Sequence, residues 1–213
     1  MRSLQASTVE IVAMQGPVTG YGRTDKYDWD RLGYSRAVAH SELGELGAKL
    51  VKPQLRSQAL EIFSAWRRRS GHILGVHMRG TDKVVRTKVP PQAYFVFIDA
   101  YLTAFPDALV LVATDDQEYL QRMRRRYGGK HGRMVRRRES VVYRSNPFGE
   151  GRGGYLRGED VLLDALLLAQ CDFLLKSASA VAEFALWVRP QLHGHHLDLQ
   201  ATDRNGNVTV MSR

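Results

Sequence analysis

The amino-acid sequence predicts an α/β protein built on a doubly wound parallel sheet with helices on both faces. Two observations lead to this prediction. Short apolar runs alternate with longer segments of helical periodicity, which is the pattern of β–α–β units. Three of the apolar runs end directly in polar residues, at 77–82, 114–116 and 177–179. In a parallel sheet these ends share one edge, and ligands bind there.

The first third of the chain leads up to a central strand. Residues Ser35–Leu50 have helical spacing, and Lys49–Gln54 predicts a short strand that ends at a proline. Apolar residues then recur at helical spacing from Leu55 to Trp66. The run Ile73–His77 follows a glycine and is apolar until its last residue, so we expect it to be a strand buried on both faces.

The rest of the chain repeats the pattern of helix and strand. Pro91 is placed to begin a helix that ends near Phe105. The glycine-rich residues 145–158 predict a mobile loop, which beside a phosphate site would serve as a lid. Helices are expected at 117–127, at 159–170 and up to Val188, and strands at 108–113, 134–135, 171–176 and 195–199. Residues 202–213 are predicted to be a polar tail.

Composition narrows the class of protein. The 213 residues suffice for one ordinary domain or two small ones, and 44% hydrophobic residues suffice for a core. No apolar run approaches the roughly 20 residues of a membrane span. Cys171 is the single cysteine, so an intrachain disulfide is excluded and the compartment is undecided.

The net charge of +9 favours anionic partners, which include nucleic acid, anionic membranes and phosphorylated small molecules. Much of the excess lies in two arginine-rich runs, Arg122–Arg126 and Arg133–Arg138. Neither run is interleaved with aromatic residues, as binding of single-stranded nucleic acid requires. We therefore expect a solvated helix face and a basic loop, and we disfavour a nucleic-acid partner.

The polar strand ends have the chemistry of a phosphate site. Arg79 offers a planar fork of donors that matches an oxyanion, and Gly80 lets the backbone approach a ligand closely. The alternative is an ordinary surface ion pair between Arg79 and Asp82. A second alternative concerns the other strand ends, where the polar residues serve only as helix N-caps: Asp115, Asp116 and Ser179.

Asp164 stands inside a helix that is apolar on most faces, so we expect this helix to be buried. A buried carboxylate needs a partner. Arg152 or Arg157 is one candidate for that partner, and a bound ligand is the other.

Four segments resemble the fucosyltransferase superfamily, closest to the α-1,6-fucosyltransferases of N-glycan cores and the related nodulation and protein O-fucosyltransferase groups. The segments are KLVKPQ, ILGVHMRGTDK, LVATDD and VLLDALLLAQCDFLLKSASAVAEFA, within residues 49–190. The resemblance implies a GT-B type enzyme of two Rossmann-like domains, whose C-terminal one binds GDP-fucose. This chain then holds a remnant of the acceptor region at 1–48, the donor domain at 49–200 and the tail at 201–213.

The resemblance also implies roles for single residues. Arg79 matches the arginine that holds the β-phosphate and is the catalytic candidate, with His77 beside the nucleotide and Asp82 orienting the arginine. The remaining matches place Asp115 and Asp116 near the ribose or base, Asp164 on guanine, and Ser177 and Ser179 by the phosphates. The chain departs from the core type at Gly80 and Ala180, where that type has an arginine and a serine.

The implied reaction is transfer of fucose, with inversion, from GDP-fucose to a hydroxyl group of a glycan or glycoprotein. The resemblance implies no metal and no cofactor, because Arg79 and a helix N-terminus neutralise the leaving diphosphate. No general base is identified. The alternatives are a transferase of the same fold that uses another nucleotide sugar, and a truncated, non-catalytic domain that binds nucleotide or nucleic acid.

Overall fold

The computed structural model describes residues 42, 44–47, 49–80, 88–129, 132–136, 152–201 and 208–211, for 152–157, 201 and 211 the backbone only. Six strands form one sheet in the order β3-β2-β1-β4-β5-β6. These are β1 (Ile73–Met78), β2 (Leu109–Thr114), β3 (Met134–Val135), β4 (Phe173–Ser177), β5 (His196–Ala201) and β6 (Val208–Met211). All neighbouring strands are parallel except β5 and β6, which are antiparallel.

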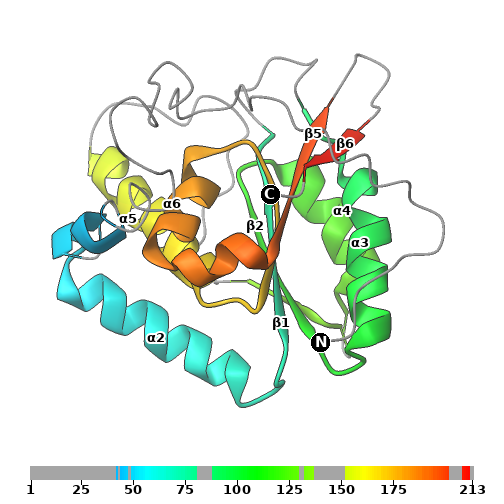
Figure 1. Ribbon diagram of the computed structural model, residues 1–213, viewed down its shortest axis with the longest axis horizontal. Coiled ribbons are helices and arrows are strands. Elements are labelled where there is room, and N and C mark those ends of the chain that lie inside the picture. Colours follow the sequence, from blue (N-terminus) through cyan, green and yellow to red (C-terminus); the bar gives the residue numbers. More distant parts are fainter. Residues whose placement is uncertain are drawn as a thin grey trace.

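Helices cover both faces of the sheet, as the sequence predicts (Figure 1). One face carries α3 (Pro91–Ala104) and α4 (Gln117–Tyr127). The other face carries α2 (Pro53–Arg67), α5 (Arg152–Ala169) and α6 (Ala180–Val188), which the 3-10 helix η3 (Pro190–Gly194) follows. The chain first builds the sheet outward from β1 through β2 to β3, and then continues from β4 on the other side of β1. The crossover point between β1 and β4 is the place where such sheets bind ligands.

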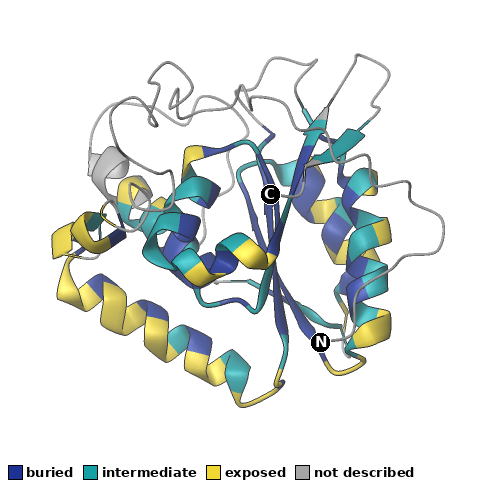
Figure 2. Ribbon diagram, in the orientation of Figure 1, coloured by how far each residue is buried: buried dark blue, intermediate teal, exposed yellow. Residues whose placement is uncertain are grey.

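The core has one layer on each side of the sheet, and β1 contributes to both (Figure 2). Leu74, Val76 and Met78 pack with the helices α3 and α4, whereas Ile73 packs with α2 and α5. Gly75 faces the same side of the sheet as Ile73, the side that α2 and α5 cover. A Cβ atom there would lie 3.1 Å from the Cys171 sulfur and 3.2 Å from Leu168, so the missing side chain lets α5 approach the strand closely. Burial also raises the pKa of the Cys171 thiol, which packs as a small apolar group.

The structure corrects three sequence predictions. Lys49 and Leu50 are helical, and α2 begins at Pro53, so the strand predicted for Lys49–Gln54 is wrong. A proline suits the first turn of a helix, because the backbone N–H that it lacks would have no acceptor within the helix at that position. Residues 152–158 begin α5 instead of ending a loop, and the rest of that predicted loop lies outside the described residues. Val208–Met211, predicted as polar tail, pair with the edge of β5.

No helix in the described ranges is long and apolar enough to cross a bilayer.

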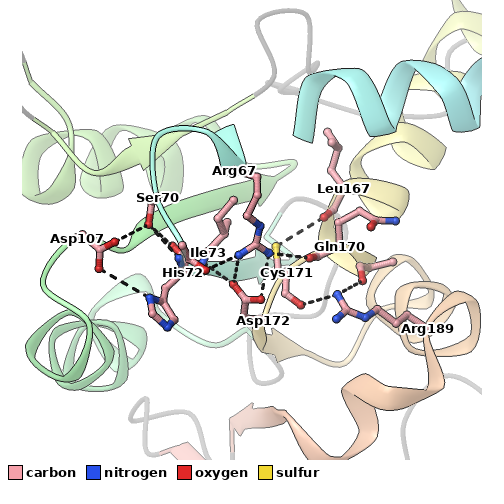
Figure 3. A network of polar contacts seen from close by, with 12 residues as sticks. Arg67, Ser70, His72, Ile73, Asp107, Leu167, Gln170, Cys171, Asp172 and Arg189 are labelled. Carbon is pink, nitrogen blue, oxygen red and sulfur yellow. Dashed lines mark hydrogen bonds and ion pairs between the residues drawn. The ribbon is translucent and has the colours of Figure 1, made fainter. Parts of the chain in front are cut away.

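A polar network joins four elements at the amino ends of β1 and β4 (Figure 3). Arg67, at the end of α2, donates to both carboxylate oxygens of Asp172 at 2.8 and 3.0 Å. The hydrogen bond to Asp172 raises the pKa of the Arg67 guanidinium. Asp172 also accepts from the Ile73 backbone N–H at 2.8 Å. Arg189, after α6, donates to the Ala169 and Cys171 carbonyls at 3.2 and 3.1 Å. The edge opposite the polar strand ends is thus fixed by charge-assisted hydrogen bonds.

The network predicts that Asp172→Asn lowers stability. The amide keeps one acceptor but turns an NH₂ group toward Arg67 or the Ile73 N–H, so the free energy of unfolding should fall by about 1–3 kcal/mol. Urea unfolding measures this loss. Asp107→Asn is the matched control, because Asp107 contacts His72 at 3.7 Å with its side chain 63% exposed. Exposed pairs contribute about 0–1 kcal/mol. Equal stability of the two variants would contradict the assigned role of Asp172.

Candidate functional site

Three strand ends meet at the carboxyl edge of the sheet, the upper edge in Figure 1. His77 lies near the end of β1, with Arg79 and Gly80 just beyond it. Asp115 and Asp116 follow β2. Ser177 ends β4 and Ser179 begins α6. The structure therefore brings together six of the eight site residues predicted from the sequence. Of the others, Asp82 lies outside the described residues and Asp164 lies elsewhere.

Asp115 organises the loop after β1. Its Oδ2 atom lies 3.1 Å from Arg79 Nη1, and its Oδ1 accepts from the Gly80 backbone N–H at 2.7 Å. The two side chains are only 23% and 12% exposed, so this ion pair is screened less than a surface pair. The family resemblance implies that Asp82, which lies outside the described residues, orients Arg79 and that Asp115 lies near the nucleoside. In the structure Asp115 holds the arginine.

Asp116 caps the helix that follows β2. Its Oδ1 accepts from the backbone N–H groups of Glu118 and Tyr119 at 2.8 and 3.2 Å, which satisfies two donors at the start of α4. Gly80 packs directly on this aspartate. A Cβ atom on Gly80 would lie 2.5 Å from the Asp116 Cβ and 2.6 Å from its Oδ2. A side chain at position 80 would therefore displace either Asp116 or the backbone of the loop after β1.

We expect Gly80→Ala to displace the cap of α4 and the loop that carries Arg79. Loss of an N-cap costs about 1 kcal/mol, and the shift of Arg79 should weaken anion binding as well. Thermal unfolding and anion titration measure the two effects. The control is Gly71→Ala, because a Cβ atom on Gly71 would meet nothing within 4 Å. If Gly80→Ala behaves like Gly71→Ala in both measurements, the packing argument fails.

The serines of the third strand end connect the loop to a helix N-terminus. Ser177 is 2% exposed, and its Oγ accepts from the Arg79 backbone N–H at 3.3 Å. Ser179 caps α6 by accepting from the Val181 N–H at 3.3 Å. Ser179 is therefore the N-cap of α6. Because the first turn of a helix carries N–H groups and partial positive charge, the start of α6 favours an anion, as does the guanidinium of Arg79.

The surroundings of His77 and Asp164 differ from each other. His77 is buried at 5% exposure and lies beneath the edge, where Tyr94 donates to its backbone carbonyl at 3.4 Å. Burial raises the pKa of the Tyr94 phenol, which therefore remains a neutral donor. Asp164 is half-buried, not buried, and lies in the C-terminal half of α5, which leads to the amino end of β4. The expectation that this carboxylate is buried is therefore wrong, and the need for a buried partner, arginine or ligand, no longer follows from it.

Sequence reasoning missed a buried lysine beside this site. Lys176, the residue before Ser177, is 1% exposed, and its Nζ lies 2.6 Å from Asp198 Oδ2 and 2.7 Å from Glu183 Oε1. The only signal in the sequence is a lysine within the apolar run FLLKS. Its partners lie 7 and 22 residues away along the chain, so no local sequence pattern indicates them.

The first basic run is a solvated helix face, as predicted. Arg122 pairs with Glu118 one turn earlier, and Arg126 pairs with Asp99 of α3. Together with Arg125 these arginines line an open groove of about 350 Å³, to which α3 contributes Gln92 and Phe95. The second run lies mostly outside the described residues. Among the described residues no cluster of histidine, cysteine, aspartate and glutamate has the geometry of a metal site.

The strand order and the polar ends at the crossover place the chain in the class of Rossmann-like α/β folds. No protein-family model and no curated protein matches the sequence. Solved structures do match. The chain is similar to NodZ α-1,6-fucosyltransferase soaked with GDP-fucose, at 18% identity and a TM-score of 0.46 over 76% of this chain and 49% of that one.

Two further structures give the same picture. NodZ co-crystallised with GDP matches at 15% identity and a TM-score of 0.41, over 74% of this chain and 48% of that one. Fucosyltransferase NodZ from Bradyrhizobium, in its Se-Met form, matches at 16% identity and a TM-score of 0.46 with the same coverage. The chain spans about half the length of these proteins. The likeness concerns the fold alone.

Proposed function

We propose that the carboxyl edge between β1 and β4 binds the diphosphate of GDP-fucose, and that the chain is the donor-binding part of a fucosyltransferase. One observation carries the proposal. The arginine of the H-x-R motif, Arg79, is held by Asp115 at 3.1 Å, and its backbone N–H is tied to Ser177, next to the start of α6. A guanidinium fork and a helix N-terminus thus lie at the same edge of the sheet, and both favour a phosphate.

The reaction in this proposal needs little covalent chemistry from the protein. An acceptor hydroxyl of a glycan or glycoprotein attacks the anomeric carbon of fucose and releases its proton to water, the bond from that carbon to the β-phosphate oxygen breaks, and the configuration inverts. Negative charge then grows on the departing GDP. Arg79 and the N–H groups of α6 are fixed before the reaction, so they stabilise this charge without reorganisation. They also take the place of a metal ion on the diphosphate.

Calorimetric titration of the full chain tests the proposal. We expect GDP and GDP-fucose to bind at least about 10-fold more tightly than UDP and ADP, a difference of about 1.4 kcal/mol, and EDTA to change neither affinity. Equal binding of all three diphosphates would contradict guanine selectivity and favour a transferase that uses another nucleotide sugar. Absence of any nucleotide binding would contradict the proposal as a whole.

A further inference from the structure

A buried charged cluster lies directly behind the proposed diphosphate site. Lys176 and Asp198 are neighbours in register on β4 and β5, with exposures of 1% and 2%. Glu183 comes from the first turn and a half of α6, with its side chain 15% exposed. The Lys176 ammonium bonds to both carboxylates at 2.6 and 2.7 Å. The cluster therefore connects a strand, its neighbour and the start of a helix.

The cluster is not explained by stability. Removing charges from water is costly, and apolar side chains of similar volume often stabilise a core equally well or better. What apolar contacts do not supply is a fixed distance and direction. Two short charge-assisted hydrogen bonds at one nitrogen set the position of Glu183 relative to β4 and β5. This geometry is the informative property of the cluster.

The position of the cluster indicates which parts of the proposed site it holds in place. Lys176 is followed immediately by Ser177, which accepts from the Arg79 N–H. Glu183 lies one turn after Ser179, and its backbone N–H donates to the Ser179 carbonyl at 3.0 Å. The same cluster therefore fixes the end of β4 and the N-terminal turn of α6, which both border the proposed diphosphate site.

We propose that Lys176 and Glu183 are positioning residues. They hold the first turn of α6 in the position where its N–H groups contact the donor diphosphate. This inference rests on the proposed function, because it assigns the residues to the same site. They touch no substrate themselves. Their contribution is to keep the distance between the helix N-terminus and Arg79 constant before the nucleotide arrives, which lowers the cost of binding.

Substitution of Glu183 tests the positioning role. Glu183→Ala removes the hydrogen bond, and we expect GDP affinity in the full chain to fall about 5- to 20-fold, which corresponds to the loss of about one charge-assisted hydrogen bond. Glu183→Gln keeps an oxygen that accepts from Lys176, and should retain affinity within about 2-fold. Asp172→Asn is the control, because it loosens the opposite edge of the sheet. It should lower thermal stability and leave GDP affinity unchanged.

Hydrogen exchange without nucleotide provides a second measurement that does not depend on the proposed function. In Glu183→Ala the backbone amides of residues 181–184 should exchange at least about 10-fold faster, through local opening of α6, while those of residues 74–78 in β1 keep their rates. The positioning role is overturned if Glu183→Ala changes neither this exchange nor GDP affinity. It is also overturned if the Asp172→Asn control loses as much affinity. If the wild type binds no GDP, the proposed function fails and the exchange result alone decides whether Glu183 holds α6 in place.

Discussion

Replacing Arg79 with alanine is expected to lower the affinity for GDP by about 100-fold, or about 2.7 kcal/mol. A guanidinium on a diphosphate makes charge-assisted, often bidentate hydrogen bonds, each about twice as strong as a neutral one. Arg79 is 23% exposed and already oriented by Asp115, so little side-chain entropy is lost on binding. Titration calorimetry on the wild type and the variant measures the difference.

Two controls separate a specific site from general attraction to a basic protein. Arg125→Ala removes an exposed arginine from α4, far from the strand ends, and should leave GDP affinity unchanged. Arg79→Lys keeps the charge but loses the fork, and should recover only part of the affinity. If Arg79→Ala and Arg125→Ala lose equal affinity, the nucleotide is bound by the net charge of +9 and not by this site.

Lys176→Met is expected to be strongly destabilising. Methionine fits the volume of the lysine stem but leaves Asp198 buried and two carboxylates without their cation. Removing one partner of a buried ion pair costs about 3–5 kcal/mol. This is a large share of the roughly 5–15 kcal/mol that stabilises an ordinary domain. Urea unfolding, or the yield of folded protein, reports the loss.

The double variant Lys176→Met, Asp198→Asn shows whether the loss is electrostatic. A neutral amide at 198 removes one buried charge, so we expect the double variant to recover at least about 1 kcal/mol of the loss, as coupled neighbours do. Asp198→Asn alone should destabilise the protein, because Lys176 then faces a single carboxylate. If Lys176→Met is as stable as the wild type, the cluster does not have the buried geometry described here.

The sheet and its functional edge could be predicted from the sequence because the signals are local. β1, β2 and β4 are apolar runs that stop at polar residues, and parallel topology then places those ends together. The helix boundaries at Pro91 and at Gln117–Tyr127 follow from proline and from the Asp116 cap. The strand predicted for Lys49–Gln54 is wrong because a proline can end a strand or begin a helix, and Pro53 begins α2.

The contacts that shape the site could not be predicted, because they join residues far apart in the chain. The pair of Arg79 and Asp115 spans two strand ends, whereas the family resemblance implies the same role for Asp82, which lies outside the described residues. The cluster at Lys176 depends on the register of β4 with β5. Asp164 was expected to be buried because its neighbours are apolar, but one helix position differs from the next by 100° of rotation. Burial of a helix as a whole does not fix burial of each residue.

Hydrogen exchange of the full chain with and without saturating GDP tests the central claim most directly, because it locates the ligand. The account predicts slower exchange at the backbone amides of residues 79–80 and 180–182, with no change on the outer face of α4 at residues 122–126. The matched experiment with UDP should show weaker protection at the same positions. Protection confined to the α4 arginines, or no protection at the ends of β1 and β4, would contradict the placement of the nucleotide at this edge.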